Sequence, residues 1–164
     1  MACRGVFFSI DDDQAGRIEA AQGDDALMEI VAEIEEAWDH EHLAECDKSW
    51  DAMHRLLADG SLEWNAGSYP LNQVVLGDPS LHVGPDYLVC LKDAPCLKDI
   101  AAAIQNIDRE QLKSLYFVKV PKDYALGVFG DEDFEYTWEN FKDVRDFYQK
   151  AANENRSVIF TVDQ

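Results

Sequence analysis

The chain has 164 residues, of which 47% are hydrophobic and 11% aromatic. This length and composition allow roughly two-thirds of the surface to be buried, so we expect one folded domain over residues 1–164 and exclude intrinsic disorder. The 33 acidic residues outnumber the 14 lysines and arginines, giving a formal net charge of −19. Because this charge repels phosphate groups, we expect neither nucleic acid nor an anionic membrane as a partner.

The N-terminal quarter begins with an apolar strand at Cys3–Ile10, which stops at the acidic run Asp11–Asp13. Aspartates favour a helix start, because their carboxylates accept backbone hydrogen bonds and match the positive end of the helix dipole. A short helix is therefore predicted at Gln14–Ala21. Apolar residues recurring every three or four positions predict a clearer amphipathic helix at Asp24–Trp38. The segment Asp39–Ala44 is predicted to be a connector.

The middle of the chain is divided by glycines and prolines into shorter elements. We expect a helix at Trp50–Ala58, which Gly60 ends, and a short helix at Pro70–Gly77. A loop fixed by two prolines then leads to an apolar strand at Tyr87–Leu91.

The second half is mostly helical. Helices are predicted at Ala94–Ile107, at Arg109–Phe117 after the capping residue Asp108, and over the long amphipathic stretch Phe134–Asn153. A short edge strand is predicted at Phe117–Val120. A charge-free strand at Ser157–Val162 closes the series. This order indicates an α+β fold, with a small, mostly apolar sheet covered by several helices and the N- and C-terminal strands at its centre.

The stretch Asp47–Leu57, "DKSWDAMHRLL", combines carboxylates, a serine, a tryptophan and a histidine. Helical spacing explains most of these residues structurally, because it places four side chains on one inward face: Trp50, Met53, His54 and Leu57. It also puts Asp51 and Arg55 four apart, as an ion pair on the outer face. A buried core histidine is therefore the favoured interpretation of His54, over a general base that lacks a positioned partner.

Other chemistry-bearing residues are sparse. His40 and His42 stand in an acidic connector without a zinc-binding pattern, and the four cysteines form no C-x-x-C pair, so we predict no metal, no cofactor and no catalytic residue. The cysteines are expected to be reduced thiols in a cytoplasmic protein, since no secretory signal or membrane-length apolar run is seen. His82 lies in a Gly- and Pro-rich loop, where functional side chains are often held.

The charge is concentrated near the N-terminus. From Asp11 to Asp51 there are fifteen acidic residues against only Arg17 and Lys48. Solubility alone explains part of this excess; the sharper hypothesis is a docking surface for a basic protein, such as a cationic toxin. The expected contact residues are Glu29, Glu33 and Glu36.

Three stretches resemble the YfbM-like bacterial proteins, a domain family of unknown function. They are "DKSWDAMHRLL", with Asp47, Lys48, Trp50, Asp51 and His54; "VVLG" at Val74–Gly77; and the closing helix and strand, with Tyr148, Ala151 and Val158. The resemblance spans nearly the whole chain. It departs at Met53, where leucine is usual, and most of all in "VKVPKDYALGVFG". It implies a compact α+β domain and no particular activity.

Two functions remain open at this point. The favoured prediction is a non-catalytic binding or accessory protein, similar to an immunity protein, whose acidic surface takes a basic protein partner. The alternative is a small-molecule-binding protein or enzyme. Its pocket is expected near Trp50, His54, His82 and Tyr87.

Overall fold

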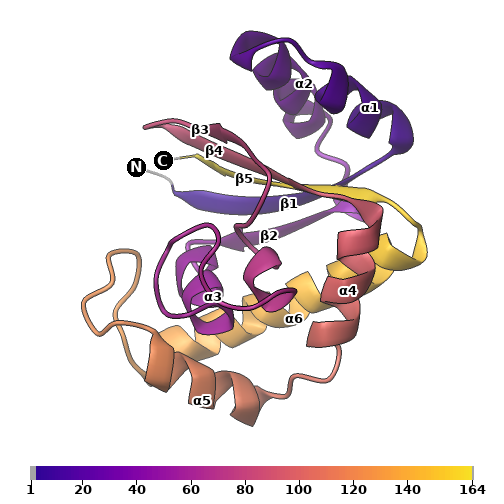
Figure 1. Cartoon of the computed structure of the whole chain (residues 1–164). Helices are drawn as coiled ribbons and strands as arrows, with labels where there is room; N and C mark the ends of the chain where they lie inside the picture. The colour runs from indigo at the N-terminus through magenta and orange to yellow at the C-terminus, as the bar shows by residue number, and fades with distance from the viewer. Residues whose placement is uncertain (1–2, 164) are drawn as a thin grey trace.

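The computed structural model describes residues 3–163, which form a five-stranded antiparallel sheet with helices on both faces (Figure 1). The strands are β1 (Arg4–Ile10), β2 (Leu43–Asp47), β3 (Ser80–Val83), β4 (Tyr87–Lys92) and β5 (Ser157–Asp163). They lie in the order β2-β1-β5-β4-β3. The two terminal strands pair along their whole length, from Arg4 opposite Asp163 to Ile10 opposite Ser157. The predicted α+β class and the central position of these strands are confirmed.

The helices form two unequal layers. On one face lie α1 (Asp12–Ala20) and α2 (Asp24–Ala37), and on the other lie α3 (Trp50–Leu57), α4 (Ala94–Ile104), α5 (Arg109–Lys119) and α6 (Asp131–Asn153) (Figure 1). Two short 3-10 turns, η1 (His40–His42) and η2 (Leu71–Gln73), complete the described elements. Within residues 3–163, no helix combines the length and the apolar character that crossing a bilayer requires.

The sheet separates two hydrophobic cores. The larger, here called the four-helix core, packs the sheet against α3–α6; the smaller, the two-helix core, packs it against α1 and α2. Side chains alternate along β1, so Phe7 enters the four-helix core while Phe8 and Ile10 enter the two-helix core. Both faces of the strand are therefore buried, which explains why its sequence is apolar without alternation.

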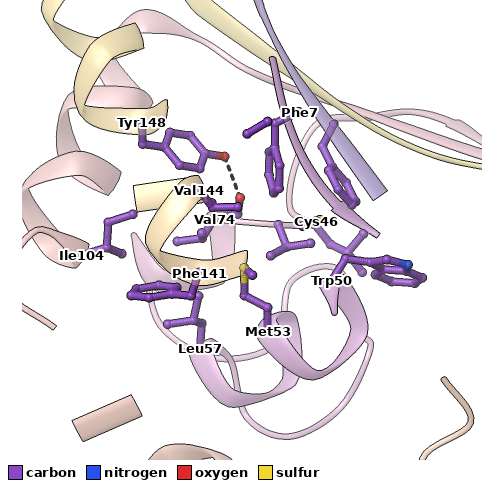
Figure 2. Close-up of a cluster of buried hydrophobic side chains, with 14 of the residues drawn as sticks. Phe7, Cys46, Trp50, Met53, Leu57, Val74, Ile104, Phe141, Val144 and Tyr148 are labelled. Carbon is purple, nitrogen blue, oxygen red and sulfur yellow. Dashed lines mark hydrogen bonds between the residues drawn. The ribbon is translucent and has the colours of Figure 1, made fainter. Parts of the chain in front are cut away.

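Figure 2 shows how distant parts of the chain meet in the four-helix core. Phe7 comes from β1, Trp50 and Met53 from α3, and Phe141 and Tyr148 from α6, and all five belong to one cluster of buried side chains. Each of these residues is at most 4% exposed. Burying a side chain of this size contributes roughly 1.5–3 kcal/mol, so this cluster is a main source of stability.

Several predicted elements differ from the structure. The end of the predicted connector, residues 43–44, and the three residues after it form edge strand β2, and the loop containing His82 forms edge strand β3. Both are short and half-exposed, so neither has the apolar run that marked the central strands. The edge strand predicted at Phe117–Val120 is wrong, because α5 continues to Lys119. The helix predicted at Pro70–Gly77 is only the turn η2, followed by an irregular segment.

Candidate functional site

The motif helix α3 is buried on nearly every side, and Arg55 is its only residue that is not. Trp50 donates its indole N–H to the carbonyl oxygen of Cys3 at 3.0 Å. The ion pair between Arg55 Nε and Asp51 Oδ1 forms at 2.6 Å, but its predicted outer-face position is wrong, since Asp51 is 2% exposed. Both side chains of the pair are largely shielded from solvent, and α5 is one of the elements that pack against α3.

His54 is a core histidine. It is 1% exposed, and its Nε2 lies 3.2 Å from the carbonyl oxygen of Glu63. Because a carbonyl only accepts, Nε2 carries the hydrogen and Nδ1 a lone pair, which has no partner in the described residues. Burial lowers the pKa of His54 to about 4, so the ring is neutral at pH 7.

His82 and Tyr87 lie on the opposite side of the sheet from His54. Tyr87 packs against the two-helix core, and its hydroxyl bonds to the carboxylate of Glu35. His82 Nδ1 stands 3.5 Å from Asp24 Oδ1. Burial raises the pKa of Glu35, which also accepts a hydrogen bond from Thr161 at 3.1 Å. The structure therefore divides the four predicted pocket residues into two separate pairs.

A cleft with a volume of about 900 Å³ lies elsewhere in the molecule. One side of the cleft is formed by the end of α1 and the start of α2. Another side is formed by the end of β4 and the start of α4. Its apolar lining residues include Ile18, Leu27 and Leu91, and four carboxylates also line it: Glu19, Asp24, Asp78 and Asp93. None of the four predicted pocket residues lines it. No sequence pattern predicted this cleft, because its residues come from four separate stretches of the chain: 18–27, 69–73, 78–81 and 91–96.

Tyr69 and Cys96 stand at the α4 side of the cleft. The Tyr69 hydroxyl donates to Asp99 Oδ2 at 2.5 Å, and Asp93 caps α4 by accepting from the Cys96 backbone N–H at 2.9 Å. Burial raises the pKa of the Cys96 thiol, so this cysteine is not an activated nucleophile despite its place in the first turn of a helix. The cleft can hold a ligand by shape and negative charge, and no acid–base pair is assembled in it.

A buried polar cluster fixes the loop at residues 120–130, whose structure the sequence patterns did not predict. Asp133 accepts hydrogen bonds from the hydroxyls of Tyr116, at 2.6 Å, and Tyr124. The backbone N–H of Gly130 donates to the Tyr116 hydroxyl at 3.2 Å. Burial, together with the bond to Asp133, raises the pKa of both tyrosines, which keeps them protonated as donors. The cluster is explained as a structural clamp on this loop.

The predicted contact residues Glu29, Glu33 and Glu36 are exposed on α2. Their spacing of four and three places them on one helix face. Glu33 pairs with Arg17 of α1, whose Nη1 is 2.7 Å from Glu33 Oε2. This pair is exposed at both ends and leaves the negative charge of the face largely unbalanced.

A second acidic surface follows the open edge of the sheet. A shallow groove of about 390 Å³ lies between β2 and α6, and its carboxylates are Glu41, Glu45, Asp143 and Asp146. None of these four forms an ion pair with any residue from 3 to 163. The one cation in the groove, Lys150, donates to the backbone carbonyl of Glu41 at 2.5 Å.

Metal-ligating side chains do not gather anywhere in residues 3–163 as a group of three or more. In the predicted connector, His42 instead contacts two carboxylates. His42 Nδ1 lies 2.7 Å from Asp39 Oδ2, and its Nε2 lies 3.3 Å from Glu154 Oε2. Its two ring nitrogens thus join η1 to the end of α6.

Comparison with solved structures finds the same fold in a protein of unknown function, YfbM from Escherichia coli. The two share 18% sequence identity with a TM-score of 0.71, over 97% of this chain and 99% of that chain. No curated protein matches the sequence. The family model for a domain of unknown function, DUF1877, matches residues 1–161. The chain therefore belongs to the DUF1877 family, in agreement with the YfbM-like resemblance of its motifs.

Proposed function

We propose that this protein is a non-catalytic binding protein, similar to an immunity protein, whose acidic surface takes up a basic protein partner in the cytoplasm. The observation that carries the proposal is the unbalanced charge of exposed helix α2, which presents Glu29, Glu33 and Glu36 on one face. Helix α2 itself contains no lysine or arginine. Opposite charge speeds the encounter of two proteins and fixes their relative orientation.

Two further features support binding over catalysis. The residues of the family motif have structural partners, since Trp50, Asp51 and His54 are all held within the core. The groove along β2 adds four unpaired carboxylates, including Glu41 and Glu45 from the same acidic segment. All four cysteines are free thiols, which fits a reducing compartment.

The test is capture of a partner from a lysate of the native cells, followed by calorimetric titration of the isolated partner at low and high salt. Charge reversal of Glu29, Glu33 and Glu36 to lysine is expected to weaken binding at least about tenfold, which corresponds to about 1.4 kcal/mol. The matched control reverses three other exposed acidic residues: Glu63, Asp123 and Glu132. Binding that is insensitive both to salt and to the α2 reversals contradicts the proposal.

A second candidate function is small-molecule binding, and the cleft of about 900 Å³ is the observation that favours it. Clefts of this size accommodate metabolite-sized ligands. Its carboxylates favour a ligand with a positive charge and an apolar body. This candidate uses the cleft between α1 and α4 in place of a pocket near Trp50 and His54.

Ligand-observed NMR with a panel of aliphatic and aromatic amines tests this candidate. Ala21→Trp fills the cleft, because Ala21 lines it, whereas Ala20→Trp adds the same bulk at an exposed position next to it. Amines that bind the unmodified protein and the Ala20 variant but not the Ala21 variant support the candidate. Equal binding to both variants places the amines elsewhere and contradicts it.

A further inference from the structure

Two buried polar side chains lie next to each other in the four-helix core. Cys90 and Lys92 are two positions apart on β4, so their side chains point to the same face of the sheet. Cys90 is 0% exposed and Lys92 is 1% exposed. The Nζ atom of Lys92 lies 2.9 Å from the Sγ atom of Cys90. This separation equals that of an ordinary N–H···O bond, although sulfur is the larger atom, so the two groups are in unusually close contact.

Lys92 has no acidic partner within residues 3–163. Its Nζ donates to the carbonyl oxygen of Val75, approaches Cys90, and lies 5.5 Å from the ring centroid of Phe160. Buried ammonium groups are normally paired with a carboxylate, because their desolvation is costly. Because Lys92 has no such partner there, the Cys90 thiol is the reactive group in contact with Nζ. The packing of the fold holds the two groups together.

We propose that Cys90 and Lys92 are a modification site at which dioxygen installs a covalent Sγ–O–Nζ bridge. The thiol S–H bond and two N–H bonds of the ammonium break, and one S–O and one O–N bond form. One oxygen atom becomes the bridge, the other leaves as water, and one proton is released. Sulfur and nitrogen are oxidised by two electrons each and dioxygen is reduced by four, as an extension of thiol oxidation to a neighbouring amine.

The surroundings favour this product over simpler oxidation. A single bridging oxygen fits between two atoms already 2.9 Å apart, whereas a direct S–N bond requires them to move to covalent distance. Lys92 also lines the cleft of about 900 Å³, which gives dioxygen a short path to the pair.

Intact mass spectrometry of the full chain tests the proposal. Protein purified without oxygen is divided, and one half is exposed to dioxygen. The exposed half is expected to gain the mass of one oxygen and lose that of two hydrogens, and a thiol reductant is expected to reverse the change. Digestion with trypsin is expected to lose its cleavage after Lys92, because that enzyme needs a free lysine side chain.

The variants locate the bridge. Cys90→Ser and Lys92→Met are each expected to abolish the mass change, while Cys96→Ser is expected to retain it. The wild-type comparison stands even where a core variant folds poorly. No mass change on exposure, a gain of oxygen without loss of hydrogen, a loss of hydrogen alone, or a change that persists in Cys90→Ser each overturns the proposal.

Discussion

The hydroxyl of Tyr148 on α6 donates a hydrogen bond of 2.6 Å to the carbonyl oxygen of Val74, and this bond anchors a buried segment without regular secondary structure (Figure 2). The next carbonyl, that of Val75, accepts from Lys92. Buried backbone groups outside helices and sheets need such partners, because water does not reach them. The "VVLG" motif of the family is thus held by side chains from α6 and β4, which explains how an irregular stretch lies at the centre of the core.

Tyr148→Phe is expected to lower the free energy of unfolding by about 1–3 kcal/mol, because it leaves the buried Val74 carbonyl without a donor. Urea denaturation at neutral pH measures the change. The matched control is Tyr136→Phe, whose hydroxyl bonds to Asp47 on the exposed surface. Water replaces that bond, so the control is expected to lose less. Equal losses in the two variants contradict the role given to Tyr148.

His54 is expected to make stability depend on pH in a defined window. Its pKa is lowered by burial to about 4 in the folded protein and is 6.5 in an unperturbed chain. The unfolded chain therefore binds a proton between these values that the folded protein does not. Stability from this residue is complete above pH 6.5 and is lost as the pH falls toward 4, by about 3 kcal/mol in total.

The measurement is urea denaturation at several pH values for wild type and His54→Gln. The variant is expected to lack the part of the pH dependence that His54 supplies, while His40→Gln, at an exposed position, is expected to keep it. If the free energy of unfolding of the His54 variant changes with pH as steeply as that of wild type between pH 4 and pH 6.5, the proton is bound by another residue.

The buried pair of Asp51 and Arg55 gives a third expectation. Burial raises the pKa of Asp51, and the hydrogen bond from Arg55 opposes this rise. Arg55→Met leaves the carboxylate buried without its partner, at an expected loss of about 3–5 kcal/mol near pH 7. A carboxyl group whose pKa is raised in the folded protein stabilises the fold most at low pH, where it is protonated, and this stabilisation is lost as the pH rises. The loss of stability caused by Arg55→Met is therefore expected to be smaller at pH 5 than at pH 7.

The double variant Asp51→Asn with Arg55→Met separates charge from packing. Removing the stranded carboxylate is expected to restore part of the stability that Arg55→Met loses. A double variant less stable than Arg55→Met shows that packing by Arg55, and not the unpaired charge of Asp51, causes the loss.

Elements with strong local signals in the sequence were predicted correctly. The capping role of Asp108 was predicted from the sequence and is confirmed: its carboxylate accepts from the backbone N–H of Gln111 at 2.8 Å, and its own N–H donates to Gln111 Oε1 at 3.0 Å. The central strands were recognised because both of their faces are buried. Edge strands β2 and β3 were missed because a half-exposed strand of four or five residues carries too few apolar positions to be distinguished from a loop.

The sites depended on long-range packing and were less accessible from sequence. Helical spacing placed His54 in the core, but it did not reveal that Asp51 is buried as well, since this burial depends on packing between distant segments. Helical spacing also did not reveal that His54 and Tyr87 lie on opposite faces of the sheet, because this depends on the arrangement of the strands between them. The cleft and the close contact of Cys90 with Lys92 arise only when loops and strands are brought together in space.

Gly60, at the exit of α3, provides a last expectation. Its backbone has φ +98°, a region that L side chains rarely adopt, and an added Cβ meets the carbonyl oxygen of Lys119 at 2.6 Å. Gly60→Ala is therefore expected to lower the free energy of unfolding by about 2–4 kcal/mol, through backbone strain and overpacking together.

Gly16 is the matched control for Gly60, because it lies within helix α1 and an added Cβ meets nothing within 4 Å. Gly16→Ala is expected to raise stability by about 0.5–1 kcal/mol, since alanine loses less backbone freedom on folding. The same chemical change is thus expected to act with opposite signs at the two positions, as measured by urea denaturation. If both variants change stability in the same direction, the close approach of α5 to the exit of α3 is not the cause of the Gly60 effect.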